Sequence, residues 1–528
     1  MGLVFRTLFD CHCILNFVRD AMRFGFFISE GNTVKRKILR VISLFAAFAV
    51  LASIAVSAAD FGTTASYIVE NVESPSHNSI GGEWSVIGVS RGGYTGTKKD
   101  AFCNKYESNA KDTLKKSSGN LSSNKSSEYS RMILAFSALG KNPKSVSGYN
   151  LYSALGDMSF VTKQGLNGSI FALIALDSKN ADSSGDVTRQ RLLRKILSSQ
   201  STDGGFSMNA SADTDIDVTA MALQALAPYK GIPKVKQAID ITLSYMSKKQ
   251  NADGSYTSYG VKNCESSCQV IIALCSLGIS PKSDSRFIKG GVSVYDDMLS
   301  YGLADGSFEH KKGGGSNLMA TEQALCAMAA YKRFTEKKSA LYDMSGYSCR
   351  FTDISSSQNR ESIVLLNRLG IVNGTSEDKF SPNANVTRAE FCTMLVKLCA
   401  IPAAKDAGFS DVKKENWFYA YVNSAFASGI VNGKGNGRFA PNDGITREEA
   451  AVMLERAAKK YSADYKAHNE SVLGNYLDSD SASSWSRSAL AYCIAEKILV
   501  PNTRSITPTR KLTREELAQM ICGFLLTL

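Results

Sequence analysis

Three copies of a Thr-Arg-x-Glu motif in the last third of the chain hold the residues best suited to bind an anion. Each copy follows a proline by five residues, and the copies begin at Thr387, Thr446 and Thr513. Threonine followed three residues later by glutamate is typical of a capping box, so each copy predicts the start of a helix. Capping explains the threonine and the glutamate.

The arginine inside each motif needs a further reason. A cation in the first helical turn opposes the helix macrodipole and costs about 0.3 to 1 kcal/mol. Free backbone N–H groups at a helix start, joined by a guanidinium, form a receptor for a carboxylate. We therefore expect Arg388, Arg447 and Arg514 to bind an acidic sugar substituent. We expect Arg447→Ala to weaken ligand binding most and Arg388→Ala less, with both variants keeping the helical fold because the threonine and glutamate of each capping box stay in place.

Other reactive side chains do not form a recognisable metal or nucleophile pattern. Cys264 and Cys268 are four residues apart, which suits one helix face better than a zinc knuckle, and no second pair completes such a site. His310 precedes a glycine run and is expected in an exposed loop. P-loop, Rossmann and serine-nucleophile signatures are absent from the sequence. No metal and no cofactor are expected.

Composition limits the partners that the chain can have. The 528 residues carry a formal net charge of +12, with 21% charged and 44% hydrophobic residues. These values are near globular averages, and the length suggests two to four domains. No long run of lysine and arginine and no nucleic-acid motif occurs, so an anionic surface is a better partner than nucleic acid.

The N-terminal segment indicates export. Lys35, Arg36 and Lys37 precede an apolar stretch that ends in Ser57-Ala58-Ala59, which is typical of a signal peptide over residues 34–59 with cleavage near Ala58 or Ala59. The alternative is an uncleaved anchor, the only contact with a membrane that we expect. Residues 1–33 are mixed in character and match neither the charged region nor the apolar core of such a signal. We interpret them as a mis-assigned start, with Val34 as the true initiator.

Helical runs alternate with Gly-Asp loops between residues 60 and 345. The loops repeat about every 50 residues, at Asp203-Gly204, Asp253-Gly254 and Asp305-Gly306. Runs that are apolar almost all round predict buried inner helices at 217–229, 268–277 and 319–331, and the amphipathic run 234–248 predicts an outer helix. This pattern resembles the α/α toroid of terpenoid cyclases and protein prenyltransferases. The resemblance implies that Gln200, Phe206, Gln250 and Tyr256 tie successive helix pairs together.

The same family raises the question of catalysis. Class II terpenoid cyclases use an Asp-x-Asp-Asp motif, which Asp213, Asp215 and Asp217 approach, but Ile216 separates the last two aspartates. We favour helix capping for them over catalysis. Protein prenyltransferases need an Asp, Cys and His zinc set that the chain does not offer. The toroid is therefore expected to be a binding or structural module, and a wall-anchored enzyme acting on a lipid or glycan is the alternative.

Three segments of the C-terminal third align with one another, at residues 351–401, 408–461 and 476–528. Each opens with an aromatic-x-Asp start, continues through a helix and a turn, and restarts at the Thr-Arg-x-Glu motif. The segments resemble the S-layer homology (SLH) domain. That family packs three repeats about a pseudo-threefold axis and binds pyruvylated secondary cell-wall polysaccharide in grooves between repeats.

The resemblance implies ten polysaccharide-binding residues. They are the arginines Arg388, Arg447 and Arg514, the aspartates Asp353, Asp411 and Asp478, the tryptophans Trp417 and Trp485, and the glycines Gly374 and Gly433. The third segment departs from the pattern, with Pro501 in place of a glycine and Asp480 as an alternative to Asp478. The first segment has Gln358 or Asn359 in place of tryptophan. The second segment is thus expected to bind best.

These patterns together predict an all-α, secreted protein in the cell wall or S-layer of a bacterium, of the Gram-positive type. Three SLH repeats would bind it non-covalently to an acidic wall polysaccharide. The α/α toroid, whose ligand is unknown, would then be displayed on the cell surface.

Overall fold

The computed structural model describes residues 59–209, 212–462, 464–501 and 503–528. Residues 1–33 and the expected signal peptide, apart from Ala59, lie outside the described residues. Residues Ala59–Leu528 form one compact unit, which is all-α apart from two short hairpins, as predicted. Among the described residues, no helix is both long enough and apolar enough to cross a bilayer.

Six helices form a closed inner ring in the first part of this unit. Each helix packs against the next, and the last packs against the first. The inner helices are α4 (Glu83–Arg91), α6 (Ser126–Ala138), α8 (Leu166–Ser178), α10 (Ile216–Leu226), α12 (Cys264–Leu277) and α14 (Leu318–Thr335). The inner helices predicted from the apolar runs lie in α10, α12 and α14, so that prediction is confirmed.

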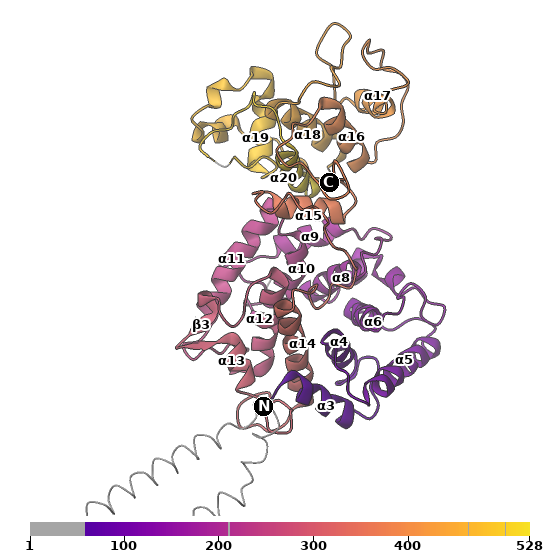
Figure 1. The fold of residues 1–528 in the computed structure, drawn as a ribbon, viewed down its shortest axis with the longest axis vertical. Helices are drawn as coiled ribbons and strands as arrows, with labels where there is room; N and C mark the ends of the chain where they lie inside the picture. Colours follow the sequence, from indigo (N-terminus) through magenta and orange to yellow (C-terminus); the bar gives the residue numbers. More distant parts are fainter. Residues whose placement is uncertain (1–58, 210–211, 463, 502) are drawn as a thin grey trace, which may run out of the picture. The chain divides into compact units, whose positions relative to one another are not determined.

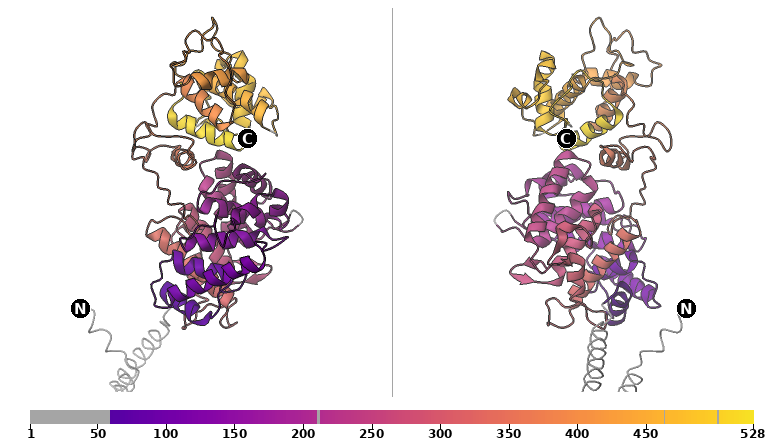
Figure 2. Two further views of the ribbon diagram at one scale, coloured as in Figure 1. Left: turned by 90° about the vertical axis from the view of Figure 1, so that its right-hand side faces the viewer. Right: turned by 60° about the vertical axis from the view of Figure 1, so that its left-hand side comes forward.

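A second layer of helices packs outside the ring. Figure 1 shows α11 and α13 outside α12, and Figure 2 shows the same helical layers from two further sides. The outer helices are α3 (Phe61–Asn71), α5 (Lys99–Lys116), α7 (Met158–Thr162), α9 (Arg189–Ser198), α11 (Pro233–Lys249) and α13 (Val294–Leu299). Helix α11 contains the predicted run 234–248. Shorter elements connect the layers: η1 (Leu151–Leu155), η2 (Ala227–Tyr229), η3 (Ser285–Phe287), β1 (Thr257–Ser258), β2 (Val261–Lys262), β3 (Ile288–Lys289) and β4 (Val292–Ser293).

The Gly-Asp loops bind one helix pair to the next. The Gln200 side chain donates to the carbonyl of Ala238 at 3.0 Å and to the hydroxyl of Thr242 at 2.8 Å, both on α11. Gln250, at the end of α11, donates to the carbonyl of Phe287 at 3.1 Å. Phe206 and Tyr256 are fully buried. The linking role is confirmed for Gln200 and Gln250, whereas for Phe206 and Tyr256 the structure shows burial in the core.

Residues 351–528 contain two α-helices in each aligned segment. The first segment has α15 (Arg360–Arg368) and α16 (Arg388–Leu398), and the second has α17 (Tyr419–Ala427) and α18 (Arg447–Tyr461). The third has α19 (Arg487–Ala495) and α20 (Arg514–Leu525), preceded by η4 (Glu470–Asn475), η5 (Ser479–Ser481) and η6 (Ser484–Ser486). All three predicted capping boxes are present, at Thr387, Thr446 and Thr513.

A ring of three backbone hydrogen bonds joins the three segments. The N–H of Val386 donates to the carbonyl of Leu512 at 3.0 Å, Leu512 donates to Ile445 at 2.8 Å, and Ile445 donates back to Val386 at 2.9 Å. These three side chains are buried. Each lies just before the second helix of its segment, so the ring brings the starts of α16, α18 and α20 together.

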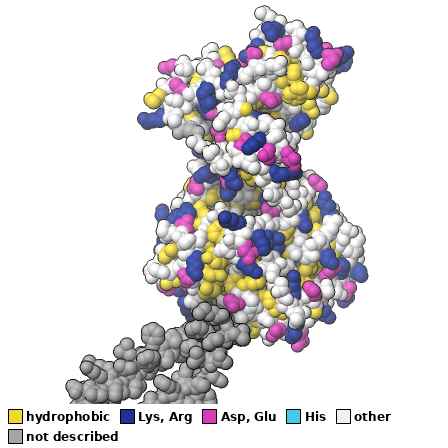
Figure 3. Space-filling view, viewed as in Figure 1, with side chains coloured by type: hydrophobic (Ala, Val, Ile, Leu, Met, Phe, Trp, Pro, Cys, Tyr) yellow, Lys and Arg dark blue, Asp and Glu magenta, His cyan; other side chains and the backbone are white. Residues whose placement is uncertain are grey.

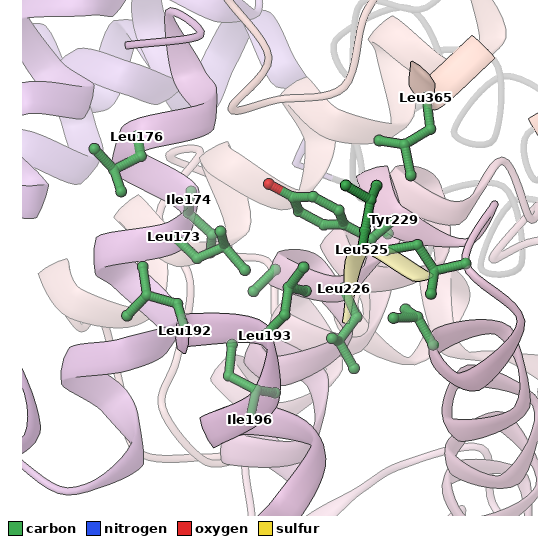
Figure 4. Close-up of a cluster of buried hydrophobic side chains, with 14 of the residues drawn as sticks. Leu173, Ile174, Leu176, Leu192, Leu193, Ile196, Leu226, Tyr229, Leu365 and Leu525 are labelled. Carbon is green, nitrogen blue, oxygen red and sulfur yellow. The ribbon is translucent and has the colours of Figure 1, made fainter. Parts of the chain in front are cut away.

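Aliphatic and aromatic side chains form one core cluster through the unit. Figure 4 shows part of it, in which leucine and isoleucine side chains of α8 and α9 lie near Leu226 and Tyr229. The cluster also includes Leu365 of α15 and Leu525 of α20. Burial of this kind contributes about 25 cal/mol per Å² of apolar surface, which is the main source of stability for such helices.

Candidate functional site

The arginine of each Thr-Arg-x-Glu motif reaches into the next segment. Arg388 donates to the carbonyl of Phe439 at 3.1 Å, and Arg447 donates to that of Ile506 at 2.6 Å. Arg514 completes the cycle, because it donates to the carbonyl of Phe380 in the first segment at 2.8 Å. The three guanidinium groups therefore occupy equivalent places, each as a link between two segments.

Two of these arginines also form buried ion pairs. Arg447 Nη2 lies 2.8 Å from Glu516 Oε1, and Arg388 Nη1 lies 3.4 Å from Glu449 Oε1. In each pair the glutamate is the capping-box residue of the next segment. Arg388 and Arg447 are 4% and 6% exposed, whereas Arg514 is only partly buried. Arg514 is thus the most accessible of the three.

The helix starts are not free anion receptors. In α16 the N–H of Arg388 donates to the carbonyl of Asp443, that of Ala389 to Pro441, and that of Glu390 to the Thr387 hydroxyl. The first three N–H groups of α18 and α20 are occupied in the same way. The expectation of free N–H groups at these positions is wrong, because the neighbouring segment supplies the acceptors that a ligand would have supplied.

The opening aspartates hold the loop before each second helix. Asp353 accepts from the N–H groups of Phe380 and Ser381, and Asp411 from those of Phe439 and Ala440, at 2.8 to 2.9 Å. Asp478, and not Asp480, does the same at 2.7 Å with Ile506 and Thr507. Partial burial would raise the pKa of Asp353 and Asp411, but these backbone donors outweigh burial and lower it.

Gly374 and Gly433 lie where a side chain would not fit. A Cβ atom on Gly374 would approach the carbonyl oxygen of Ser376 to 2.4 Å, and one on Gly433 would approach that of Arg438 to 2.6 Å. Gly433 also has a φ of +78°. The loops thus need these glycines for their own packing.

The two tryptophans are the exposed members of the predicted set. Trp417 precedes α17 and is 61% exposed, and Trp485 lies in η6 and is 56% exposed. Lys413 and Lys414 are exposed just before Trp417. An exposed aromatic side chain beside cations can contact an acidic sugar ring without rearrangement of the core.

In the toroid, Asp215 caps α10 as expected. Its carboxylate accepts from the N–H groups of Asp217 and Val218, and it also accepts from the Ser258 hydroxyl at 2.6 Å. Asp217 differs, because burial and the neighbouring Asp215 charge raise its pKa from 3.8 to about 6. Helix capping thus accounts for Asp215 but not for Asp217.

We expect substitutions of these two aspartates to have opposite effects on stability. The native Asp217 carboxyl keeps its proton to a higher pH than the unfolded one, so stability falls as the pH rises from about 4 to about 6. Asp217→Asn should therefore stabilise the chain by about 2 kcal/mol at pH 7.5 and have little effect at pH 4. Asp215→Ala should destabilise it by about 1 kcal/mol through loss of the cap. Thermal unfolding at both pH values measures this, and a stabilising effect of Asp217→Asn at pH 4 alone would contradict the assignment.

A buried group of charges that the sequence did not indicate lies at the starts of three inner helices. His77 Nδ1 lies 2.7 Å from Glu83 on α4, and its Nε2 lies 3.2 Å from Glu128 on α6. Arg131 pairs with the same Glu128 at 2.9 Å. Burial would lower the pKa of His77, but the two carboxylates outweigh burial and raise it to about 9. Burial raises the pKa of Glu322, on α14, to about 7.

The remaining cysteines and histidines behave as expected from their neighbours. The Cys264 and Cys268 sulfur atoms are 3.8 Å apart in α12, and both are buried. His310 lies in a partly exposed loop and contacts Glu265 at 2.9 Å. Among the described residues, no three His, Cys, Asp or Glu side chains are grouped so as to hold a metal ion.

Two family models match the two parts of the chain. Residues 350–392 and 408–451 match the S-layer homology domain, and the matches at 105–286 and 151–339 are to the prenyltransferase α/α toroid domain. The chain therefore contains SLH domains and a prenyltransferase-like α/α toroid, as the sequence resemblance predicted.

Curated relatives place the chain among cell-surface proteins. It is 37% identical over 157 residues to an endoglucanase of Bacillus sp. (strain KSM-635), a match that covers 29% of this chain and 16% of that protein. It is 26% identical to the surface-layer 125 kDa protein of Lysinibacillus sphaericus and 29% identical to the S-layer protein sap of Bacillus anthracis. These two matches cover 30% of this chain and 13% and 19% of those proteins. The matches thus span less than a fifth of each relative, and they support a location in the cell wall or S-layer.

Solved structures align with about half of the chain at low identity and low TM-score. An unsaturated glucuronyl hydrolase of Bacillus sp. GL1 aligns with a TM-score of 0.39 and 12% identity, over 55% of this chain and 99% of that one. The ent-copalyl diphosphate synthase of Streptomyces platensis aligns with a TM-score of 0.33 and 16% identity, over 47% and 49%.

Proposed function

We propose that this chain is an exported surface protein that residues 351–528 hold on an acidic, pyruvylated wall polysaccharide. The SLH match and the exposed Trp417, which follows the exposed Lys413, Lys414 and Glu415 in the chain, support this proposal most directly. An aromatic face can stack on a sugar ring while ammonium groups attract its carboxylate. The attachment is non-covalent, and residues 60–345 are displayed as a toroid that binds a ligand of its own.

The third segment is proposed to be an SLH repeat as well, although the family model matches only the first two. Its Asp478 makes the same pair of backbone hydrogen bonds as Asp353 and Asp411, and Thr513 forms the same capping box. Arg514 makes the same carbonyl contact to the first segment that Arg388 makes to the second. These equivalences support three repeats, 351–401, 408–461 and 476–528, arranged in a cycle.

The ten proposed polysaccharide-binding residues divide by exposure into two groups. Trp417 and Trp485 contact the ligand, with Arg514 as the most accessible of the three arginines. The other members shape the groove from beneath, because their polar groups are already hydrogen-bonded within the protein. This division changes the expected order of importance, which the sequence alone had given to Arg447.

Binding to purified walls tests the proposal. The chain from Ala59 to Leu528 should sediment with wall sacculi, and chemical removal of the acidic polysaccharide should reduce bound protein at least tenfold. Sacculi that are re-N-acetylated but keep the polysaccharide serve as the control. Equal sedimentation with stripped peptidoglycan would contradict the proposed anchor.

A further inference from the structure

The six inner helices line a cavity of about 360 Å³ that opens to solvent near their N-terminal ends. Every inner helix contributes to its wall, so the cavity lies at the centre of the ring. The wall residues on the inner helices are Trp84, Ser127, Glu128, Arg131, Asn167, Phe171, Met221, Gln269 and Gln323. Cavities of this size are common for small-molecule sites, which generally have apolar walls with few polar groups. Here the polar groups are in the majority.

Amide side chains dominate the polar part of the wall. Gln269 on α12 donates through Nε2 to Gln323 Oε1 on α14 at 2.7 Å. Gln269 in turn accepts from Gln224 on α10 at 2.9 Å. This relay of three amides across three adjacent helices fixes the orientation of each group. It leaves the Gln323 amide nitrogen with no acceptor among the described residues.

The opposite wall offers an acceptor. Asn167 Oδ1 on α8 is buried and has no hydrogen-bond donor in the part of the chain that the structure describes. A buried polar atom without a partner costs about 1 to 3 kcal/mol, so such an atom in a cavity wall indicates a ligand that satisfies it. Asn167 thus adds an amide with an unpaired buried oxygen to the wall, on the other side of the ring from the Gln323 amide.

Two aromatic rings form an apolar corner between these polar walls. The ring centroids of Trp84 and Phe171 are 5.7 Å apart, with an angle of 51° between the ring planes. Near the corner Glu128 pairs with both His77 and Arg131, whereas Lys125, which also lines the cavity, has no ion pair among the described residues. The corner thus offers apolar faces beside groups that donate and accept hydrogen bonds.

We infer that the toroid cavity binds a saccharide. A sugar ring has hydroxyl groups that both donate and accept at its rim, and apolar C–H faces that pack on an aromatic ring. An isoprenoid chain has no group that could accept from the Gln323 amide nitrogen, which argues against a lipid in this cavity. This inference goes beyond wall anchoring and does not depend on it.

Single-tryptophan fluorescence tests the inference. The sequence has three tryptophans, so the double substitution Trp417→Phe and Trp485→Phe leaves Trp84 in the cavity as the only reporter. The same substitutions remove the proposed wall-binding aromatics, so the measured signal is independent of the anchor. The chain from Ala59 to Leu528 is titrated with the tetramers of N-acetylglucosamine, glucose and xylose. Farnesyl diphosphate and tetra-alanine are titrated in parallel.

We expect a saturable change in Trp84 emission with at least one of the three saccharides. Gln269→Met and Gln323→Met should each weaken that binding about tenfold or more, because they remove amide groups at nearly constant length. Gln237→Met, at an exposed position of α11, is the matched control and should leave binding unchanged. Unfolding curves of all variants check that the toroid stays folded.

Three results would overturn the inference. The first is the absence of a saturable change with all three saccharides. The second is binding of farnesyl diphosphate or tetra-alanine in preference to them. The third is saccharide binding that both glutamine substitutions leave unchanged in folded protein.

Discussion

Replacing Arg447 by alanine is expected to destabilise residues 351–528 by about 3 kcal/mol. The substitution removes the donor to the Ile506 carbonyl and the buried partner of Glu516, which lie 2.6 and 2.8 Å from the guanidinium. Breaking a buried ion pair from one side leaves a desolvated charge, and such changes cost about 3 to 5 kcal/mol. Arg510 also contacts Glu516, which offsets part of the loss.

The matched control is Arg438→Ala in the same segment. Arg438 is 65% exposed in its side chain and lies 3.5 Å from Asp411, so its loss should cost less than about 1 kcal/mol. Thermal unfolding followed by circular dichroism compares the two variants. Unchanged unfolding of Arg447→Ala together with lost wall binding would show that the arginine serves the ligand and not the fold.

Joint replacement of Trp417 and Trp485 by alanine is expected to lower wall affinity about a hundredfold with no loss of stability. Both side chains are more than half exposed, and the contact between Trp417 and Phe418 is an edge-to-face pair at 5.3 Å. A hundredfold loss corresponds to about 1.4 kcal/mol for each of the two aromatic contacts, which is within the range for aromatic side chains at binding surfaces, whereas exposed side chains contribute little to folding.

Sedimentation with wall sacculi at several protein concentrations measures this effect. Tyr259→Ala is the control, because Tyr259 is an exposed aromatic side chain, at 85%, in the toroid. It should leave wall binding unchanged. Full wall affinity in the double tryptophan variant would place the polysaccharide site elsewhere on residues 351–528.

The distribution of surface charge indicates that individual exposed side chains, and not a long-range electrostatic field, should determine wall binding. In Figure 3 positive and negative side chains are interspersed over the visible face, without a large patch of one sign. Salt screens such charges beyond about 10 Å. Contacts at individual aromatic and cationic side chains are thus the better candidates for specificity.

The sequence was sufficient for features that depend on local order. The capping boxes at Thr387, Thr446 and Thr513 and the inner helices α10, α12 and α14 all follow from spacing within a few turns of chain. Local propensity and periodicity determine such features directly. The links made by Gln200 and Gln250 reach 38 and 37 residues along the chain, and only the family resemblance implied them.

Features that depend on distant partners were not predictable. Nothing next to Arg388 indicates that Phe439 and Glu449 would occupy its guanidinium, or that Asp443 would take its N–H group. The charges around His77 meet only when α4 and α6 pack side by side, and the amide relay needs α10, α12 and α14 in place. An inference of function from an unpaired helix start fails when a neighbouring repeat supplies the missing acceptor.

The backbone ring of Val386, Ile445 and Leu512 has a consequence for the order of folding. The acceptor for the Val386 N–H is the carbonyl of Leu512, which is 126 residues later in the chain. Before the third segment is made, only one of the three ring bonds, from Ile445 to Val386, can form. Long-range contacts form slowly, because the closure of a long loop must precede any gain from the contact. We expect residues 351–528 to gain stability in a single late step, once the last segment has been synthesised. Partially made chains would keep this surface open to chaperones and proteases.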